Sequence, residues 1–487
     1  MNAHTTAATA DPGATPRPAE TVEVKPVFLY QAHRKIYPKA VQGLFQNWRW
    51  AVVWITQLVF YGLPWLSWNQ RQAVLFDLGA RRFYIGPLVL YPQDFIYLTA
   101  LLLISAYALF LFTAVAGRLW CGYACPQTVY TEVFMWLERQ FEGDRAARMK
   151  RDAGPWTADK LARKSGKQAS WLALAGWTGF TFVGYFTPIH TLAASVIAGT
   201  LGAWEIFWVL FYGFATYGFA GYMREQVCKY MCPYARFQSA MFDKDTLIIS
   251  YDSARGEPRG SRSKKADPSQ LGLGSCVDCN LCVQVCPTGI DIRKGLQYEC
   301  IGCAACVDVC DQVMDKMNYP RGLVRYATQN GLAQGLSQSQ MLRRMARPRV
   351  LVYTAILALI TLALGTSLAL RTPFKVDIVR DRASLARMVD DGWVENVYRL
   401  QVMNATEAAQ TYRVSADGLP GLVADSQPLK LGPAEARWLT LALRVPPQTV
   451  QQQKAGAHEV HFTIERVAHD GDAARLLREK STFMIPR

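Results

Sequence analysis

Long apolar stretches interrupt this chain, and polar sequence separates each from the next. Five of them reach the length of about twenty mostly apolar residues that a helix needs to cross a bilayer. They are residues 50–68, 95–117, 170–188, 204–223 and 350–370. The pattern predicts a multidomain membrane protein whose helical part is an α-helical bundle of five transmembrane helices.

The periodicity changes after the fifth stretch. Apolar side chains occupy every second position over residues 398–402, 439–445 and 460–464, and turn-like sequence separates these runs. Such alternation is typical of strands with one buried face. We therefore predict an all-β domain, a small β-sandwich over residues 372–487, outside the membrane.

Polar sequence divides the rest of the chain. The first residues, to about Lys25, are rich in Ala, Thr and Pro and lack the apolar core of a signal peptide, so we expect a disordered tail. The cysteine-rich block, at about residues 270–320, is expected to be cytoplasmic. The predicted domains are an N-terminal cytoplasmic tail over 1–47, four membrane helices over 48–223, a cytoplasmic region over 224–349, the fifth helix over 350–371 and the β-domain over 372–487.

Basic residues predict the orientation. They fill the loop between the second and third stretches, as Arg118, Arg139, Arg145, Arg148, Lys150, Arg151, Lys160, Arg163, Lys164 and Lys167. Residues 189–203 carry no charge, whereas the sequence after the fourth stretch is rich in Arg and Lys up to Arg349. Because basic loops stay in the cytoplasm, the N-terminus is predicted inside and the C-terminal domain outside. The net charge of +15 then reflects loops that face an anionic leaflet, and no base-reading motif indicates nucleic acid.

All twelve cysteines fall into four short motifs. Two motifs form a double C-x2-C-x2-C-x3-C run, which contains Cys276, Cys279, Cys282 and Cys286 and then Cys300, Cys303, Cys306 and Cys310. The other two motifs each follow a predicted membrane helix and contain Cys121 with Cys125 and Cys228 with Cys232. No cysteine is left for ordinary packing, so we interpret the thiols as metal ligands.

The double run predicts an inserted bacterial two-cluster ferredoxin domain of the α+β class, with two 4Fe-4S clusters. In such domains the last cysteine of each run binds the other cluster. The expected ligands are Cys276, Cys279, Cys282 and Cys310 for cluster 1 and Cys300, Cys303, Cys306 and Cys286 for cluster 2. Asp311 stands where Pro287 follows the first run, but spacing and ligand number are kept. Structural zinc is disfavoured, because it takes four ligands from paired C-x2-C motifs.

The two motifs beside the membrane both read C-x-Y-x-C-P. If the helices pack in pairs, their four thiols lie at one depth and converge. The i, i+4 spacing places each pair on one helical face if the helix continues to the proline. We take Cys121, Cys125, Cys228 and Cys232 as a candidate copper or redox site, because thiolates bind Cu(I) and can pass electrons to Cu(II). The alternatives are ordinary buried cysteines and a redox dithiol, whose usual spacing is C-x2-C.

Haem is disfavoured by the same inventory. The sequence contains no C-x2-C-H motif, and His190 is the only histidine near a predicted membrane helix. No bis-histidine haem can therefore be built inside the bundle.

Long stretches of distinctive sequence surround the cysteine motifs. They include CGYACPQTVYTEVFMWLER at 121–139, MREQVCKYMCPYARFQSAMFDKDTLI at 223–248 and CVQVCPTGIDIRKGLQYECIGCAAC at 282–306. With these stretches the chain closely resembles the bacterial CcoG/FixG/RdxA family of cytochrome c oxidase accessory proteins. The resemblance runs through almost the whole chain from Lys35 onward.

The resemblance implies a multi-pass protein of the bacterial inner (cytoplasmic) membrane, with an immunoglobulin-like domain in the periplasm. It also implies a role in assembling the cbb-type cytochrome c oxidase, in which the family reduces Cu(II) to Cu(I) for the copper centre. The expected activity is that of a cupric reductase that carries two 4Fe-4S clusters and handles copper ions. Oxidase subunits or other assembly factors are the expected partners.

Two other classes of function stay open beside the copper reductase. The first is a quinol dehydrogenase, similar to the membrane ferredoxins of nitrate-reduction systems, which share paired C-x3-C-P motifs with a double ferredoxin. It predicts quinol oxidation without copper. The second is a non-catalytic assembly scaffold, in which cluster reduction is irrelevant to function. The long family-type stretches and the outer β-domain favour the copper reductase.

Overall fold

The computed structural model describes residues 35–267, 270–381, 386–467 and 475–486. The predicted tail up to about Lys25 lies outside these residues. The chain divides into two compact units, Met1–Ile36 and Tyr37–Arg487, and all elements named below belong to the second unit.

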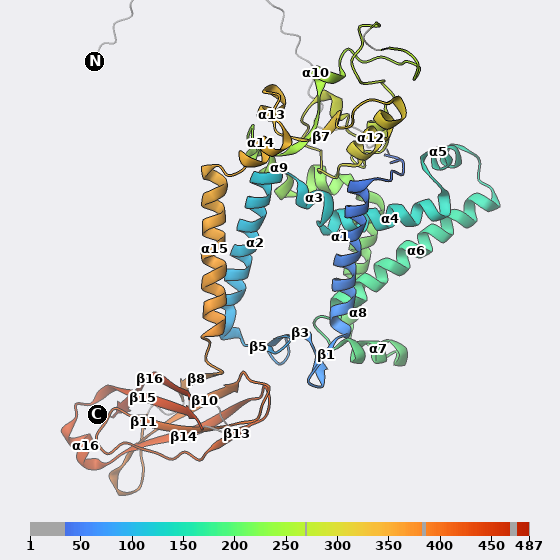
Figure 1. The fold of residues 1–487 in the computed structure, drawn as a ribbon. Helices are drawn as coiled ribbons and strands as arrows, with labels where there is room; N and C mark the ends of the chain where they lie inside the picture. Colours follow the sequence, from blue (N-terminus) through green and yellow to red (C-terminus); the bar gives the residue numbers. More distant parts are fainter. Residues whose placement is uncertain (1–34, 268–269, 382–385, 468–474, 487) are drawn as a thin grey trace, which may run out of the picture. The chain divides into compact units, whose positions relative to one another are not determined.

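Long helices form at all five apolar stretches (Figure 1). They are α1 (Leu44–Gly62), α2 (Phe95–Ala116), α6 (Ala158–Val183), α8 (Ala203–Thr216) and α15 (Pro348–Ala369). The chain of α8 continues as a π-helical segment, η3 (Tyr217–Met223). The helix α1 ends before Pro64, which lies in the short turn η1 (Leu63–Trp65), so the first predicted stretch is not helical as far as residue 68.

Among the described residues, three helices are long and apolar enough to cross a membrane. Their spans are Pro92–Ala116, Ala203–Met223 and Pro348–Ala369. The helices at the other two predicted stretches extend into polar sequence, because α1 also contains Arg49 and α6 also contains Lys160 and Lys164, all of which precede the predicted stretches. Three apolar helices indicate a membrane protein, and the count of five spans stays a prediction.

The helices α2 and α15 pack along each other (Figure 1). At one end of the pair Arg371 lies 3.8 Å from Asp94 and donates a hydrogen bond to the Val89 carbonyl at 2.7 Å. At the other end Arg347 donates to the Ala114 carbonyl at 2.7 Å. The main helical partner of α2 is therefore the fifth predicted span, not another member of the first four.

The helices α6 and α8 form a second pair. Their backbones approach so closely that a Cβ atom added at Gly179 would lie 2.2 Å from the Val209 carbonyl oxygen. Glycine permits such a crossing, which is common where helices pack within a membrane. The helix α4 (Pro126–Glu142) packs on α6 and on η3, and α1 also contacts α6.

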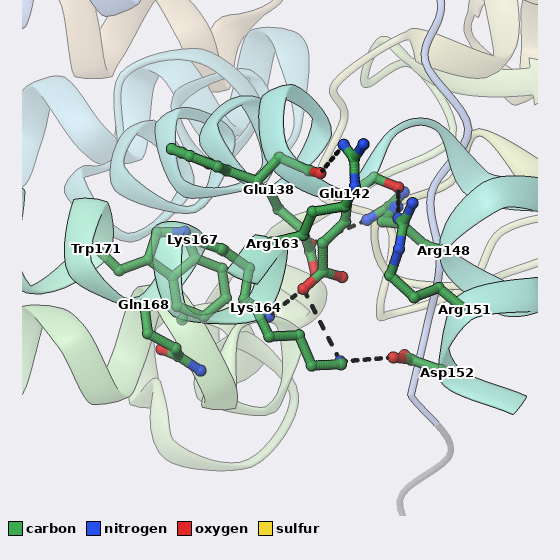
Figure 2. A network of polar contacts seen from close by, with 12 residues as sticks. Glu138, Glu142, Arg148, Arg151, Asp152, Arg163, Lys164, Lys167, Gln168 and Trp171 are labelled. Carbon is green, nitrogen blue, oxygen red and sulfur yellow. Dashed lines mark hydrogen bonds and ion pairs between the residues drawn. The ribbon is translucent and has the colours of Figure 1, made fainter. Parts of the chain in front are cut away.

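A buried ionic network joins α4, α5 (Arg145–Ala153) and α6 (Figure 2). Glu138 accepts a hydrogen bond from Arg148 at 2.9 Å. Glu142 lies 2.9 Å from Lys167 and 3.9 Å from Lys164. Arg148 and Lys167, which belong to the basic loop used to predict orientation, are buried here. These two cations neutralise carboxylates instead of facing lipid, so the orientation depends on the exposed members of that loop.

The cysteine-rich block lies in a small α+β region. The strands β6 (Ile248–Tyr251) and β7 (Val324–Ala327) pair antiparallel and bring the two ends of the block together. The elements between them are α10 (Ser253–Gly256), α11 (Leu281–Gln284), η5 (Ile292–Lys294) and α12 (Ala305–Met317). Two short helices, α13 (Gln329–Ala333) and α14 (Gln338–Arg343), lead on to α15.

The C-terminal residues form a β-sandwich, as the alternation predicted. One sheet has the strand order β12-β14-β10-β8, with β9 beside β10, and the other has the order β13-β11-β15-β16. Tyr398 and Leu400 from the first sheet and Phe462 from the second are fully buried in the shared core. The strands are β8 (Phe374–Arg380), β9 (Arg387–Met388), β10 (Val394–Asn404), β11 (Gln410–Asp417), β12 (Val423–Ala424), β13 (Leu429–Leu431), β14 (Ala436–Val445), β15 (Gly456–Arg466) and β16 (Arg475–Ile485), with α16 (Pro447–Gln452) after β14.

Short elements connect the long helices. Between α1 and α2 lie β1 (Ser67–Trp68), β2 (Arg71–Gln72), β3 (Val74–Asp77), β4 (Arg82–Ile85), β5 (Leu88–Leu90) and η2 (Pro92–Asp94). The helix α7 (Ile189–Ala198) lies between α6 and α8.

Candidate iron-sulfur and thiol site

The first cavity of the cysteine-rich region has four thiols in its wall. Its lining includes Cys276, Cys279, Cys282 and Cys310. Cys279 is exposed, whereas the other three are partly or fully buried. The structure thus brings Cys310, from the second run, to the first three thiols of the first run.

The second cavity holds the complementary set. Its lining includes Cys286, Cys300, Cys303 and Cys306, together with Cys282, which also lines the first cavity. Four isoleucines supply much of the remaining wall, at positions 249, 290, 292 and 301. Cys286, from the first run, therefore lies with the first three thiols of the second run.

The helix α12 explains the departure at Asp311. It carries Cys306 toward the second cavity and Cys310 toward the first. Without a proline after Cys310, α12 continues to Met317, and the Asp311 carboxylate accepts a hydrogen bond from the Gly322 amide at 2.9 Å. Because Asp311, and not a proline, follows Cys310, the helix α12 continues past the second run, and both groups of thiols stay in place.

Burial makes these thiols weak acids when no metal is bound. Desolvation raises the pKa of Cys282 to about 11 and the pKa values of Cys300 and Cys310 to about 12. Desolvation also raises the pKa of Cys303 and of Cys306. The thiolate is the form that binds metal, so positive metal charge has to replace these protons. Two cavities with four such thiols each fit iron-sulfur clusters.

The spacing of the thiols separates a cluster from a single ion. Within the described part of the chain, no three His, Cys, Asp or Glu side chains surround one point where a metal ion could bind. A zinc site requires such convergence. A 4Fe-4S cube does not, because each of its irons takes one thiolate.

Arginine side chains lie beside both cavities. Arg293 lines the first cavity and donates to Asp291 at 2.8 Å. Arg49 pairs with the buried Glu132 at 3.1 Å, and its charge opposes the desolvation that raises the pKa of Cys303. Cationic surroundings favour thiolates and favour a reduced cluster, since reduction adds negative charge.

The first C-x-Y-x-C-P motif begins where α2 ends. Gly117, with a φ of 55°, stops the helix. The short helix α3 (Leu119–Tyr123) then carries Cys121, and Cys125 is extended just before Pro126 opens α4. A left-handed residue and a proline therefore frame the two thiols.

The second motif repeats this course. Arg224, with a φ of 39°, stops η3. The π-helical turn η4 (Val227–Met231) carries Cys228, and Cys232 is extended before Pro233 opens α9 (Pro233–Met241). The duplication predicted from the sequence is therefore also a duplication of backbone structure.

The helix does not continue to the proline in either copy, so the expected i, i+4 face is wrong. Cys125 has a ψ of 127° and Cys232 a ψ of 109°. The ring of the following proline disfavours the helical conformation at the residue before it. Each pair of thiols therefore consists of one helical and one extended cysteine.

All four thiols lie within electrostatic range of one another. Cys121 interacts with Cys125, Cys228 and Cys232. Desolvation raises the pKa of Cys121 to about 12 and that of Cys228 to about 11, and Arg118 partly opposes both shifts. Arg118 therefore lies near Cys121 and Cys228, and no three of the four thiols surround a single point.

The first motif touches the second cavity through glycine. A Cβ atom added at Gly122 would lie 2.8 Å from the carbonyl oxygens of both Ile301 and Gly302. Gly302 has a φ of 70°, and a Cβ added there would lie 3.1 Å from the Arg118 carbonyl oxygen. The loop between Cys300 and Cys303 therefore lies directly on the first motif.

Side chains of both motifs complete this contact. Cys121 and Cys228 pack on the buried cluster that contains Ile301 and Cys303. The four-thiol group and the second cavity are thus neighbours within one packed core.

The sequence did not predict several polar contacts that the first motif makes with its surroundings. Tyr123 lies within hydrogen-bonding reach of Tyr326, which donates to the Gly302 carbonyl at 2.6 Å. The Cys121 thiol donates to Gln238 of α9 at 3.3 Å and so links the first motif to the helix that follows the second. Their positions in the sequence were the only indication of a role, because Tyr123 lies inside the first motif and Gln238 lies shortly after the second.

Arg224 anchors the second motif. Its guanidinium lies 2.9 Å from Glu138 and 5.5 Å from the centre of the Trp171 ring. Desolvation alone would raise the pKa of Glu138, but the charges of Arg224 and Arg148 hold it below its usual value. Arg224, at which η3 ends, therefore shares the carboxylate of Glu138 with Arg148.

Three family models match the chain. A 4Fe-4S binding domain matches residues 98–142, which contain the first C-x-Y-x-C-P motif. A 4Fe-4S dicluster domain matches residues 223–329, which contain the second motif and the double run. The model described as the IG-like fold at the C-terminal of FixG matches residues 364–486. The chain therefore contains two 4Fe-4S binding regions and a C-terminal immunoglobulin-like domain.

Similar proteins cover most of the chain. The nitrogen fixation protein FixG of Rhizobium meliloti is 39% identical over 82% of this chain and 83% of its own length. The proteins RdxB and RdxA of Cereibacter sphaeroides are 39% and 37% identical over 80% and 81% of this chain, and over 83% and 84% of their own lengths. A crystal structure of a FixG-related protein from Vibrio parahaemolyticus, 24% identical, aligns with 23% of this chain and 97% of its own with a TM-score of 0.20. The identity and coverage of the FixG, RdxB and RdxA proteins show that the chain belongs to the FixG/RdxA family.

Proposed function

We propose that this FixG/RdxA-type iron-sulfur protein reduces Cu(II) to Cu(I) at the membrane, for the copper centre of a cbb-type cytochrome c oxidase. The observation that carries the proposal is the direct contact between the four-thiol group and the second cavity, in which Gly122 lies against Ile301 and Gly302. Electron transfer needs such proximity, and copper reduction needs soft ligands beside the electron source.

The cavities are suited to one-electron transfer. When bound, 4Fe-4S cubes supply single electrons at potentials set by charge and surroundings. The residues of this chain contribute apolar walls that exclude water, eight thiols as ligands, and the cations Arg49 and Arg293 beside them. An exposed cysteine, Cys279, leaves the first cavity accessible from the surface.

The four-thiol group is suited to a soft ion. Sulfur ligands select Cu(I) over hard cations, and two thiols suffice for a low-coordinate Cu(I) ion. Cys121 and Cys228 are the candidates for this pair, because both pack on the core of the second cavity. Cys125 and Cys232 lie nearby in extended segments that end at prolines.

A third cluster is the second candidate for this group. The match of residues 98–142 to a 4Fe-4S binding domain favours it, because these residues contain Cys121 and Cys125. The lack of three convergent ligands in the described residues is compatible with a cube as well as with a two-coordinate ion. Iron content separates the two, since two cubes require about eight irons per chain and three require about twelve.

The activity is tested under anaerobic conditions with the full chain in detergent. The clusters are reduced with dithionite, the reductant is removed, Cu(II) is added, and Cu(I) is followed with a chelator while cluster absorbance recovers. Cu(I) should appear in step with cluster oxidation. The quadruple Cys121→Ser, Cys125→Ser, Cys228→Ser, Cys232→Ser variant should fail, and Lys229→Ala, which changes the same motif without removing a thiol, should behave as wild type.

Each alternative gives a different result. A quinol dehydrogenase ignores copper, and its clusters are reduced or oxidised by a quinol or quinone. A scaffold supports oxidase assembly in cells even when its clusters are kept oxidised. An iron content that falls from about twelve to about eight in the quadruple variant identifies the third cube.

The cellular setting completes the proposal. We place five helices in the bacterial inner membrane, the cysteine-rich region in the cytoplasm and the β-sandwich in the periplasm, in agreement with the basic loops. Oxidase subunits or other assembly factors are the proposed partners. Protease protection of the β-sandwich in right-side-out vesicles would contradict this orientation.

A further inference from the structure

Two cavities in the helical part have no role in copper reduction itself. The larger, of about 750 Å³, is formed by α1, η1, α4 and α6 and has five tryptophans in its wall, namely Trp50, Trp54, Trp65, Trp136 and Trp177. The smaller, of about 290 Å³, is bounded by Ala124 and Pro126, the two neighbours of Cys125. Gln57 lines both cavities, which therefore adjoin.

Polar side chains gather where the cavities adjoin. The hydroxyls of Tyr61 and Thr178 are 2.9 Å apart. Tyr130 lies within hydrogen-bonding reach of Tyr61, Thr178 and Gln57. Thr178 is buried, and the other three are partly buried. A hydrocarbon chain would offer these groups nothing, whereas a ring with oxygen substituents could accept and donate hydrogen bonds.

The larger cavity reaches the surface of the helices. Trp54 and Leu58 of α1, which line it, are 61% and 67% exposed. In a bilayer this side of α1 would face lipid, so a long apolar chain could enter from the membrane. The site therefore combines an apolar aromatic groove with a polar inner end beside Cys125.

We propose that these cavities bind a membrane hydroquinone, with its ring beside Tyr130 and Gln57 and its isoprenoid tail along the tryptophans of α1. The inference rests on the proposed function, since it supplies the electrons that copper reduction consumes. It names a lipid-soluble donor of hydrogen and electrons, whose chemistry matches both the polar end and the apolar groove.

The redox balance is complete. Oxidation breaks both O–H bonds of the hydroquinone, converts its hydroxyls to the two carbonyls of a quinone, and releases two protons and two electrons. Two oxidised 4Fe-4S cubes, held by the eight thiols of the double run, would each accept one of these electrons. The protons leave through hydroxyl groups, for which Tyr130, Tyr61 and Thr178 provide a connected set.

The path for the electrons is short. The smaller cavity touches the residues on both sides of Cys125. Cys125 interacts electrostatically with Cys228, and Cys228 packs on the core of the second cavity. A ring bound beside Pro126 would therefore lie at the same packed core as the thiols and the second cavity.

Binding is measured first, without any redox step. Quinone with a short tail is titrated into the full chain in nanodiscs, and quenching of tryptophan fluorescence reports occupancy of the aromatic groove. Tyr130→Phe and Gln57→Leu should each weaken binding roughly tenfold, the usual effect of one lost hydrogen bond. Tyr107→Phe, on α2 and away from both cavities, is the matched control and should bind as wild type.

Electron transfer is measured next. Under anaerobic conditions the corresponding quinol should bleach the cluster absorbance of the wild type and of Tyr107→Phe, and should do so roughly tenfold more slowly at subsaturating quinol in the two cavity variants. Dithionite should reduce the clusters fully in all four proteins, which shows that the variants are folded and loaded.

The outcomes separate the inference from the function on which it rests. If dithionite-reduced protein converts Cu(II) to Cu(I) but quinol never reduces the clusters, copper reduction stands and the quinol inference falls. Equal quenching in wild type and both cavity variants would show a groove for lipid chains alone and would also overturn it. Quinol reduction that depends on Tyr130 and Gln57 supports the inference even if copper is ignored, in which case the proposed function falls instead.

Discussion

The two C-x-Y-x-C-P motifs share a sequence and a backbone course but not an environment. Tyr123 of the first copy reaches Tyr326 of the cysteine-rich region, whereas its counterpart Tyr230 is 57% exposed. Gly122 lies against the backbone of residues 301–302, whereas its counterpart is Lys229. The first copy thus contacts the second cavity through Cys121 and the backbone at Gly122, whereas the second copy contacts it through Cys228 and leaves Tyr230 exposed. The two copies supply two pairs of thiols, and the backbone of the first pair also forms a close contact with residues 301–302.

The largest expected effect concerns the anchor of the second copy. Glu138→Gln leaves Arg148 and Arg224 buried without their carboxylate, and breaking a buried pair typically costs about 3–5 kcal/mol. Thermal unfolding of the full chain, followed by circular dichroism, should show the loss. The rate of alkylation should rise more at Cys228 than at Cys121, because Arg224 lies in the segment that precedes Cys228. Glu459→Gln, at an exposed glutamate of the β-sandwich, is the control. Equal changes in both thiols would mean that the network does not serve the second copy in particular.

The next effect concerns the acidity of the thiols in metal-free protein. Desolvation raises the pKa of Cys228 from 9.0 to about 11, so its thiolate fraction at pH 8 falls roughly a hundredfold. Iodoacetamide should therefore modify Cys228 and Cys121 far more slowly in the folded than in the denatured chain, with Cys228 the faster of the two. Similar rates in the folded and denatured states would contradict this.

The same shift has a consequence for stability. Above pH 9 the unfolded chain releases thiol protons that the folded chain retains, so the folded state binds more protons and its stability falls as pH rises. This contribution is fully present below the unfolded pKa and is lost as pH approaches about 11 at Cys228. Unfolding of the metal-free protein measured from pH 8 to pH 11 checks the sign.

A smaller effect should distinguish Gly122 from Lys229. A methyl group at Gly122 would lie 2.8 Å from two carbonyl oxygens, and overpacking of this kind typically costs about 1–3 kcal/mol. Gly122→Ala should lower the unfolding temperature and the amount of cluster retained during purification. Lys229→Ala should change neither. A stable, fully loaded Gly122→Ala protein would show that the two regions can separate without loss.

The smallest effect is that of a single hydroxyl. Tyr123→Phe removes the hydrogen bond to Tyr326 and should cost about 1 kcal/mol, while Tyr230→Phe should be neutral. Denaturant unfolding of both variants, in parallel with Cu(I) formation, measures the difference. A larger effect of Tyr230→Phe than of Tyr123→Phe would contradict the assignment of Tyr123, and not Tyr230, to the contact with Tyr326.

The periodicity of the apolar positions and the spacing of the cysteines predicted much of this fold. Alternation over residues 398–402 marked a strand because those side chains lie in one shared core, and the same holds for residues 460–464. The apolar stretches correctly predicted where helices occur, but the predicted helix ends were wrong. Helix α6 begins at Ala158, where the Thr157 side chain caps it, and its Lys167 lies 2.9 Å from the buried Glu142 instead of facing water. A basic side chain reads as exposed in a sequence, and its buried partner on another element cannot be inferred from spacing.

The site was predictable in its ligands and not in its contacts. Cysteine spacing sorted the eight thiols of the double run into the two groups that line the two cavities. The contact of Gly122 with Gly302 joins positions 180 residues apart in the sequence, and no local periodicity encodes it. The extended conformation of Cys125 could have been inferred from Pro126, because proline restricts the residue before it.

The paired helices α2 and α15 each contain 22 residues, which corresponds to about 33 Å of helix. Arg371 holds them at one end and Arg347 at the other, so the two cannot slide past each other. A bilayer thicker or thinner than this length must then be met by tilting both helices as one body or by deforming the lipid. Because both ends are tied, any tilt that adapts α2 to the bilayer has to carry α15 with it.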